Sequence, residues 1–386
     1  MAFRIPGTRY AIKVEKRLFV RREIPAIVSI ISAMAGILLG GLLFIAVGIS
    51  PTEVYSRIAR VAVSPTALMG AVEIALPIMF TSMALVLPFR MAFYNIGGEG
   101  QFEVGAIAAM IPIILYWSGV DMPVPLYLPV MFLLAFIAGG LWGLLPAFLR
   151  AKWKVNEILV TLMMNTISLQ IIWWLTTPGG PWNEANPVFK ERYLAYLKKL
   201  GVHLIPGFKG TPVVPEFARL PRIPGTLVNV GVLIAVVIAI ILYFVSTKTL
   251  LGYEVRVVGD SERGAMYGGI NYLKLVLIVM FISGGLAGLG GFIGITAFLP
   301  KLSPEIGIAG YGYSGIIVAW LARLNPIACL LVSFFFGILT KSADLLQQEL
   351  KISRFIAVGF EGLIFILLVL GDFFVHYRVR IIKLRR

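Results

Sequence analysis

The chain has 386 residues, of which 59% are hydrophobic and only 14% are charged. A soluble domain carries about a quarter charged residues, so this composition excludes an ordinary soluble enzyme or binding module and indicates a membrane protein. The net charge of +15 raises the possibility of nucleic-acid binding. We expect no nucleic-acid partner, because the charges gather between apolar runs, where they set membrane topology and attract anionic lipid.

The N-terminal segment, residues 1–23, is basic. It precedes a run from Ile24 to Ile49 that contains no charged residue. A signal peptide also has a basic start, but its hydrophobic region has only about 7–15 residues. We therefore expect a retained first transmembrane helix. The single cysteine, Cys329, excludes an intramolecular disulfide, and two histidines leave no His/Cys metal cluster.

Further apolar runs predict an all-α polytopic fold over residues 24–375. A helix needs about 20 apolar residues to span a bilayer. Four more runs have no charge, and three have isolated charges. Two shorter runs are candidates for broken or re-entrant helices, which require cover by protein or a cavity. The predicted count is about ten spans. The charge-free runs are Met122–Leu149, Ile158–Gly180, Thr226–Ser246 and Leu275–Pro300; those with isolated charges are Thr66–Phe89, Ile96–Trp117 and Phe355–Phe374; the short ones are Ile306–Ala322 and Pro326–Thr340.

Lysine and arginine mark cytoplasmic segments, and they are abundant in residues 1–23 and in the tail, residues 376–386. Both ends are therefore predicted to be cytoplasmic in a multi-pass protein of the cell membrane, which requires an even number of spans. Alternation places residues 248–274 inside and residues 177–225 outside. The outer loop is basic as well, but long loops determine topology weakly. We expect it to form an ordered cap with a short helix through Phe189–Leu200.

Two glycine-containing segments match at one offset. Residues Ile96–Gly105 read Ile-Gly-Gly-Glu-Gly-Gln-Phe-Glu-Val-Gly, and residues Ile306–Gly315 read Ile-Gly-Ile-Ala-Gly-Tyr-Gly-Tyr-Ser-Gly. An offset of 210 residues aligns the isoleucines and three glycines (97 with 307, 100 with 310, 105 with 315). Because the predicted spans run in opposite directions, the match indicates an inverted-topology repeat, with a substrate path near the midplane. The alternative is chance in a chain with 40 glycines.

The first glycine segment also has a helical pattern. At about 100° per residue, small residues lie on one face and Asn95, Glu99 and Glu103 on the opposite face. Small residues allow close helix packing, and carboxylates inside a span usually face a cavity or a partner. We therefore predict Asn95 and Glu99 beside a polar path. The alternative is that Glu99 and Glu103 lie at the cytoplasmic end and meet water or Arg90. The small residues are Gly97, Gly100, Val104 and Ala108.

A second glycine-rich run, Gly284–Gly294, contains two GxxxG spacings. Such spacings favour close helix packing in lipid, and a flexible break with a functional role is the alternative.

Four stretches carry more specific motifs: Phe93-Tyr-Asn-Ile-Gly-Gly-Glu-Gly-Gln101, Lys154-Val-Asn-Glu-Ile-Leu-Val-Thr-Leu-Met-Met-Asn165, Gly252-Tyr-Glu-Val-Arg-Val-Val-Gly259 continuing to Tyr267-Gly-Gly-Ile270, and Ser283-Gly-Gly-Leu-Ala-Gly288. In this order they resemble the permease subunits of bacterial and archaeal ABC importers for nucleosides and simple sugars, the branched-chain and ribose type. The Asn-Ile-Gly-Gly-Glu-Gly-Gln version is closest to the nucleoside branch. The loop 177–225 is longer than that branch usually has.

The resemblance implies several partners. These are a second permease subunit in a homo- or heterodimer, a cytoplasmic ABC ATPase that carries ATP and magnesium, and an extracellular substrate-binding lipoprotein. The chain itself has no G-x-x-x-x-G-K-[ST] phosphate loop, so we expect no enzyme activity and no cofactor in it. The segment 248–274 mixes charged and apolar residues, as a helix docking into an ATPase groove would. The alternative is an interfacial helix on the membrane. The predicted coupling residues are Glu254, Arg256, Gly259, Asp260, Arg263 and Tyr267.

An importer permease working by alternating access is the function we predict. An ion-coupled secondary transporter, with Glu73, Glu99 or Glu361 relaying protons, is the main alternative, and an intramembrane enzyme would need a nucleophile or metal motif that is not visible. Aromatic side chains could stack on a nucleobase, although aromatics also gather at membrane interfaces. The aromatics concerned are Phe102, Trp173, Trp174, Tyr311 and Tyr313. The full predicted path comprises Asn95, Glu99, Gln101, Glu73, Asn165, Tyr311 and Tyr313, with Gln101 added on the resemblance alone.

Overall fold

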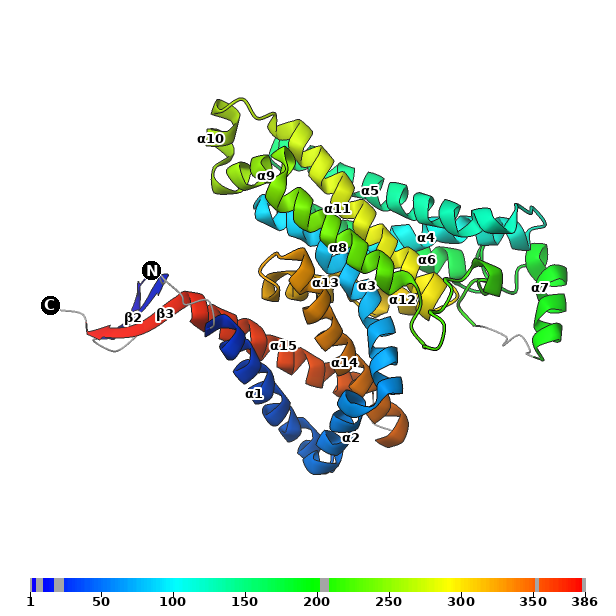
Figure 1. The fold of residues 1–386 in the computed structure, drawn as a ribbon, viewed down its shortest axis with the longest axis horizontal. Helices are drawn as coiled ribbons and strands as arrows, with labels where there is room; N and C mark the ends of the chain where they lie inside the picture. Colours follow the sequence, from blue (N-terminus) through cyan, green and yellow to red (C-terminus); the bar gives the residue numbers. More distant parts are fainter. Residues whose placement is uncertain (1, 5–9, 17–23, 202–207, 351–353, 384–386) are drawn as a thin grey trace. The chain divides into compact units, whose positions relative to one another are not determined.

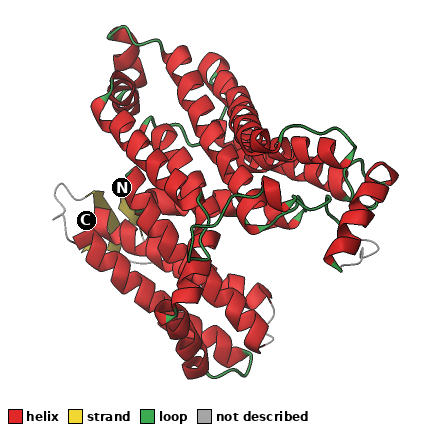
Figure 2. Ribbon diagram, turned by 45° about the vertical axis from the view of Figure 1, so that its right-hand side comes forward, coloured by secondary structure: helices red, strands yellow, loops and turns green. Residues whose placement is uncertain are grey.

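The computed structural model describes residues 2–4, 10–16, 24–201, 208–350 and 354–383, and helices dominate it (Figures 1 and 2). The longer helices are α1 (Ile24–Ala46), α2 (Pro51–Val63), α3 (Pro65–Arg90), α4 (Gly98–Trp117), α5 (Tyr127–Trp153), α6 (Glu157–Thr176), α7 (Pro187–Leu200), α8 (Gly231–Lys248), α9 (Leu250–Asp260), α11 (Tyr272–Ile293), α13 (Tyr311–Leu321), α14 (Pro326–Leu350) and α15 (Arg354–His376). The shorter elements are α10 (Glu262–Tyr267), α12 (Glu305–Ile308), the 3₁₀ turns Val124–Leu126 and Glu216–Ala218, a π-helical turn Gly294–Phe298, and the strands β1 (Ala2–Arg4), β2 (Tyr10–Lys16) and β3 (Tyr377–Lys383).

Seven helices in the described part of the chain are long and apolar enough to cross a membrane. They include all four of the later charge-free runs and the two runs before residue 118 that carry isolated glutamates. The fold is therefore confirmed as an α-helical polytopic membrane protein. The first and last long helices, α1 and α15, carry the shorter apolar segments Met34–Ala46 and Gly362–Val375.

The chain divides into two compact units, one made of Met1–Ser64 with Leu339–Arg386 and the other of Pro65–Ile338. In the larger unit, α11 forms the centre and packs against α3, α4 and α5. Glycines make these contacts close, because a Cβ on Gly288 would lie 3.2 Å from the Cα of Gly139, and one on Gly285 would lie 2.5 Å from the ring of Phe136. The prediction that the 284–294 glycines serve helix packing is confirmed.

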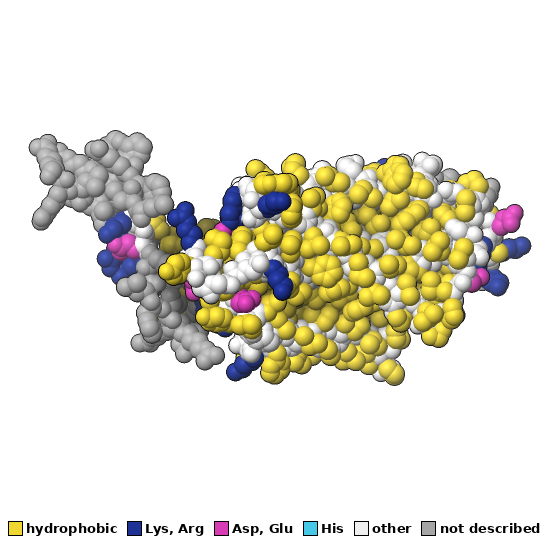
Figure 3. All heavy atoms as spheres, turned by 90° about the horizontal axis from the view of Figure 1, so that it is seen from above, with side chains coloured by type: hydrophobic (Ala, Val, Ile, Leu, Met, Phe, Trp, Pro, Cys, Tyr) yellow, Lys and Arg dark blue, Asp and Glu magenta, His cyan; other side chains and the backbone are white. Residues whose placement is uncertain are grey.

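The outward face of α5 shows why this packing needs lipid. Leu133, Ile137, Leu141 and Leu145 recur every four residues and are all more than a third exposed, while the glycines of the opposite face lie against α11. Hydrophobic side chains cover the middle of the larger unit on the face drawn in Figure 3, and charged side chains lie toward its ends. This distribution is that of a helix bundle surrounded by acyl chains.

Turns of the larger unit gather at two opposite ends. At one end, Arg90 of α3 and Arg256 of α9 both donate to the carbonyl of Ser246 in α8. Lys154, just after α5, pairs with Glu262 of α10. These contacts join the turns that follow α3, α5 and α8. At the other end, the turns after α4, α6 and α11 join through Trp117 with Val213 (3.0 Å) and through Thr211 with Leu302. Figure 1 shows α9 and α10 at one end and α7 at the other.

The described parts of the segment after α6, residues 177–201 and 208–225, form a cap on the end of the larger unit, and the short helix expected near Phe189–Leu200 is confirmed as α7. Asn186 caps its start by accepting from Val188 N–H, and Gly201 ends it in a left-handed conformation at φ +67°. Arg192 donates to the Tyr116 carbonyl (2.8 Å) and to Asp121 (2.6 Å). The hydrogen bond to Asp121 is also the main reason why the pKa of Arg192 is raised.

The two short runs near the C-terminus differ from each other. The first is broken into α12 and α13, with Gly310 between them at φ +69°, a conformation that glycine adopts without strain. The second continues through α14 as one helix of 25 residues. The expectation of a broken helix is therefore confirmed for residues 306–322 only. Helix α14 is continuous because the charged and polar residues after Thr340 also suit a helix and extend it beyond the apolar run.

The smaller unit joins the two ends of the chain. Helices α1 and α15 pack closely, with the Phe44 and Phe360 ring centroids 5.2 Å apart. Beyond them, β2 pairs antiparallel with β3, and β1 with β2, in a three-stranded sheet. This sheet is a correction to the purely helical fold we expected. The alternation in Tyr10-Ala-Ile-Lys-Val favours a strand, whereas the many lysines and arginines of the same segment indicate only its side of the membrane.

Candidate substrate path and coupling segment

Helix α4 starts inside the larger unit and not at its end. Gly98 lies against Leu85, which is five residues, or about 8 Å along the axis, before the end of α3 at Arg90. Helix α13 also starts within the bundle, because the left-handed conformation of Gly310 interrupts the helix between α12 and α13. A helix start exposes backbone N–H groups that need acceptors, and polar side chains supply them at both starts.

Asn95 lies just before α4 and is completely buried. Its Oδ1 accepts from Gly97 N–H (3.0 Å), and its Nδ2 donates to Gln101 Oε1 (3.0 Å) and to Ser283 Oγ (3.1 Å) on α11. The helical wheel placed Asn95 on the same face of the helix as Glu99. That placement is wrong, because α4 begins only at Gly98, so Asn95 does not follow the helical rotation and instead pairs with Gln101.

Asn165 on α6 is the second capping residue. Its Oδ1 accepts from Gly100 N–H (2.9 Å), and its Nδ2 donates to the carbonyl of Ile96 (2.9 Å) and to the hydroxyl of Tyr313 (3.2 Å). Gly100 has no room for a side chain, since a Cβ there would lie 2.8 Å from Asn165 Oδ1. Gly97 and Gly100 of the small face thus pack closely on α6, as expected of small residues, but Glu103, expected on the opposite face, also contacts Ser168 of α6. Asn165 connects α6 with α4 and α13.

Glu99 caps the start of α13. Its Oε2 accepts from Gly312 N–H (2.5 Å) and Tyr313 N–H (3.4 Å), where the helix dipole favours a negative charge. The carboxylate is 2% exposed, and among the described residues its Oε1 has no hydrogen-bond partner. Glu99 thus has one oxygen fixed by the backbone and one oxygen available.

Glu103 follows one turn later and is equally buried. Its Oε2 accepts from Ser168 Oγ (2.5 Å), while Gly307 packs directly on its carboxylate. Arg90, which we considered as a partner for the glutamates, donates to Ser246 and Leu324 carbonyls instead. The interpretation that these carboxylates pair with Arg90 at the end of the bundle is therefore wrong.

The predicted tyrosines have different surroundings. Tyr311 is 7% exposed, its ring lies 5.7 Å from that of Phe102, and its carbonyl accepts from Thr81 Oγ1 (3.0 Å). Tyr313 is 41% exposed. Glu73 lies about two turns before Thr81 on α3 and is partly buried. Glu361 lies on α15 outside the residues whose side chains are described.

Three polar residues that contact the predicted path residues were not predicted from the sequence: Thr81, Ser168 and Ser283. Ser168 carries a weak signal, since it follows Asn165 at helical spacing, and Ser283 begins one of the family motifs. Thr81 has no signal in the sequence, because only the folded chain brings it to Tyr311.

The coupling segment, residues 248–274, consists of α9 and α10, which Ser261 separates and caps. Val255, Val258 and Ala265 are buried, whereas Tyr267 is 97% exposed and Tyr253 is 55% exposed. Gly259 packs so closely on the carbonyl of Arg90 that no side chain fits between them. The segment is thus fixed to the bundle on one face and presents aromatic side chains on the other.

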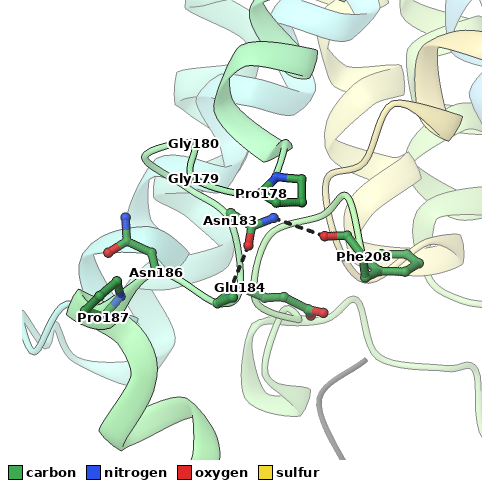
Figure 4. Close-up of a pocket in the computed structure, with 9 residues that line it drawn as sticks. Pro178, Gly179, Gly180, Asn183, Glu184, Asn186, Pro187 and Phe208 are labelled. Carbon is green, nitrogen blue, oxygen red and sulfur yellow. Dashed lines mark hydrogen bonds between the residues drawn. The ribbon is translucent and has the colours of Figure 1, made fainter. Parts of the chain in front are cut away.

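A small pocket of about 150 Å³ lies in the cap (Figure 4). The side-chain amide of Asn183 in its lining makes hydrogen bonds within the protein. It donates to the carbonyls of Thr176 and Phe208 and accepts from Ala185 N–H. Glu184 is buried there, and desolvation raises the pKa of its carboxyl, partly offset by Lys301 and Tyr193. The pocket is therefore mainly a structural feature of the turn. Described residues include no group of three or more His, Cys, Asp or Glu side chains that could hold a metal.

The helix bundle, with helix starts inside it and an exposed segment at one end, is that of a polytopic membrane protein. Residues 67–370 match the family described as branched-chain amino acid transport system / permease component. The chain belongs to this family and is a permease subunit of an ABC transporter, located in the membrane. This assignment favours the importer permease over the secondary transporter and the intramembrane enzyme.

The chain is similar over nearly its whole length to the glucose ABC transporter permease protein TsgB13 of Haloferax volcanii, with 29% identity over 97% of this chain and 96% of the relative. The guanosine ABC transporter permease protein NupP of Bacillus subtilis is 27% identical over 82% of this chain and 85% of its own. The nucleoside ABC transporter permease protein NupB of Lactococcus lactis is 24% identical over 82% and 83%. No solved structure matches the chain significantly.

Proposed function

We propose that this subunit translocates a nucleoside or a simple sugar. The relatives support both, because a glucose permease and guanosine and nucleoside permeases match over most of the chain. These substrates share several hydroxyl groups, and a buried set of carboxylates and amides can replace the water that hydrates them. The observation that carries the proposal is the similarity over nearly the whole length of TsgB13. The nucleoside-type motif Asn95–Gln101 supports it.

The path is proposed to run beside the starts of α4 and α13. Asn95, Gln101 and Asn165 position these helix starts, and Tyr313 and the available oxygen of Glu99 face the substrate. The exposure of Tyr313 and the lack of a hydrogen-bond partner for Glu99 Oε1 within the described residues support these roles. Glu73 and Tyr311 are assigned to the walls of the path.

The topology is proposed to have ten spans, with both ends cytoplasmic. The spans are α1, α3, α4, α5, α6, α8, α11, the broken pair α12 and α13, α14 and α15. Two observations support this count. The turns of the larger unit alternate between its two ends, and the pairing of β2 with β3 brings the two ends of the chain together, as a topology with both ends on one side of the membrane requires.

The glycine repeat is proposed to be an inverted pair. Glu103 contacts Gly307 and Glu99 contacts Gly312, so the second segment runs against the first. Opposite direction is what an inverted repeat requires. Both segments also contain the start of a helix inside the bundle, at Gly98 and at Tyr311.

The partners are proposed from the family and from the surfaces. A cytoplasmic ABC ATPase would bind α9 and α10, where Tyr267, Tyr253, Met266 and Leu250 are all exposed, since large apolar side chains at an end of a bundle mark an interaction site. The ATPase would carry the ATP and magnesium. A second permease subunit would complete the path, and an extracellular binding lipoprotein would deliver substrate to the cap that contains α7.

The test uses the complete transporter reconstituted in liposomes, with its binding protein. Uptake of radiolabelled guanosine, adenosine, ribose and glucose is measured against an amino acid such as leucine. We expect ATP-dependent uptake of a nucleoside or a sugar. Replacing Tyr313 with alanine should raise the substrate concentration for half-maximal uptake about tenfold, because a stack on a base is worth about 1–3 kcal/mol. Uptake of leucine alone would refute the substrate class.

A further inference from the structure

Helix α13 is held at its start and just after its end by two side chains from one short stretch of the chain, Arg90 and Glu99. At its start, Glu99 Oε2 accepts from the N–H groups of Gly312 and Tyr313. After its end, the carbonyl of Leu324 accepts from Arg90 at 2.8 Å. These two contacts fix the start of this helix of 11 residues, about 16 Å long, and the turn that follows it.

The side of α13 is joined to α3. Trp320 stacks on Phe89 with ring centroids 5.5 Å apart, and Ala319 packs with Phe89 in a buried cluster. Gly315 allows this approach, because a Cβ there would lie 2.6 Å from Thr81 Oγ1 and 2.9 Å from Ser82 N. Helix α13 therefore packs along its side on the last part of α3.

Arg90, the last residue of α3, also contacts the coupling segment. Its second guanidinium nitrogen donates to the carbonyl of Ser246 (3.3 Å), which accepts from Arg256 of α9 as well (2.6 Å). Gly259 of α9 packs on the backbone carbonyl of Arg90. Two cations thus share one carbonyl near the end of α8, and any displacement of α9 changes the position available to Arg90.

We propose that Arg90 is the positioning residue that transmits movement of α9 to α13, and through α13 to Glu99 in the substrate path. This inference rests on the proposed role of α9 as the ATPase contact. The sequence of contacts is α9, the Ser246 carbonyl, Arg90, the Leu324 carbonyl, α13 and Glu99. Arg90 can join the two carbonyls because a guanidinium presents donors in a fixed planar fork, whereas lysine presents a single ammonium.

A purely structural Arg90 would make a different prediction. If it only stabilised the end of α3, its loss would lower the amount of folded complex and reduce ATP hydrolysis and uptake in the same proportion. A transmitting Arg90 separates the two activities, since the ATPase still binds α9 and hydrolyses ATP while α13 no longer follows.

The experiment compares Arg90→Gln with Arg323→Gln in the reconstituted complex. Arg323 is the matched control because it lies in the turn after α13 and is exposed. We expect R90Q to lower substrate uptake at least tenfold while ATP hydrolysis and co-purification of the ATPase stay within twofold of the unaltered complex, and R323Q to leave all three unchanged. Proportional loss of uptake and hydrolysis in R90Q, or uptake no lower than in R323Q, overturns the proposal.

Two further variants complete the design. If R90Q does not assemble, R90K and R323K replace the pair, and uptake per ATP hydrolysed must fall in R90K alone. Arg263→Glu tests the proposed contact of the coupling segment with the ATPase separately. Unchanged co-purification in R263E overturns the role of the segment and with it this inference, whereas weakened co-purification in R263E together with normal uptake in R90Q overturns the transmission by Arg90 only.

Discussion

Replacing Asn165 with alanine should destabilise the protein more than any other single change in the predicted path. Asn165 makes three interhelical hydrogen bonds, at 2.9, 2.9 and 3.2 Å. Alanine leaves two backbone groups, the buried Gly100 N–H and the partly buried Ile96 carbonyl, without these partners. An unsatisfied buried group costs about 1–3 kcal/mol, and interhelical hydrogen bonds in membranes average about 0.6 kcal/mol each. We therefore expect a loss of about 2–4 kcal/mol in the free energy of unfolding.

The assay is reversible unfolding in mixed micelles with an increasing fraction of SDS, followed by tryptophan fluorescence. Thr161→Val on the same helix is the control. The Thr161 hydroxyl is buried too, but it donates to the carbonyl of Glu157 one turn earlier in α6 (2.7 Å), so its removal leaves no interhelical group unsatisfied and should cost less than about 1 kcal/mol. A destabilisation by N165A no larger than that by T161V would refute the reasoning, because the helix starts would then have other acceptors.

Two more predictions concern packing and pH. Gly288→Ala should destabilise by about 1–3 kcal/mol, because its Cβ would meet the α5 backbone, whereas Gly359→Ala, with open space around it, should have no such effect; equal melting temperatures for the two variants would contradict the helix contact. The raised pKa of Glu184 means that the folded cap binds this proton more tightly than the unfolded chain, so the stabilisation is complete below the unfolded pKa and is lost as pH rises through the folded pKa. Limited proteolysis of the cap should therefore be faster at pH 7 than at pH 5, and a pH dependence that persists unchanged in Glu184→Gln would exclude this carboxyl as its cause.

Apolar runs predicted the helices of the membrane region well, because about 20 consecutive apolar residues are the length that a bilayer span requires and are rare in soluble folds. The exact start of α4 was not predictable from the wheel. Periodicity continues smoothly back to Asn95, and only the folded contacts with Gln101 and Ser283 show that Asn95 lies outside the helix. A buried carboxylate in an apolar run was enough to predict a polar environment for Glu99. Its hydrogen bonds to Gly312 and Tyr313 at the start of α13 join residues far apart in the sequence, so no local pattern predicts them.

The terminal sheet was missed for a different reason. Strand pairing between residues 10–16 and 377–383 is a contact between the two ends of the chain, and local pattern alone does not specify such a partner. The break before α13 was foreseen from the short apolar run, whereas its contact with Arg90 depends on the turn Ala322–Asn325 and has no local signature.

The pairing of the first and last helices has a consequence for biosynthesis. Gly40 on α1 lies against the ring of Phe360 on α15, and about 320 residues separate them. At a translation rate of about 5–20 residues per second, α1 is made about 15–60 s before its partner exists. During this time its glycine face meets lipid or the insertion machinery, and β2 is a strand with no β3 beside it. The smaller unit is therefore completed only after α15 and β3 have been made, so chain termination before residue 354 releases a protein whose first helix lacks its partner α15.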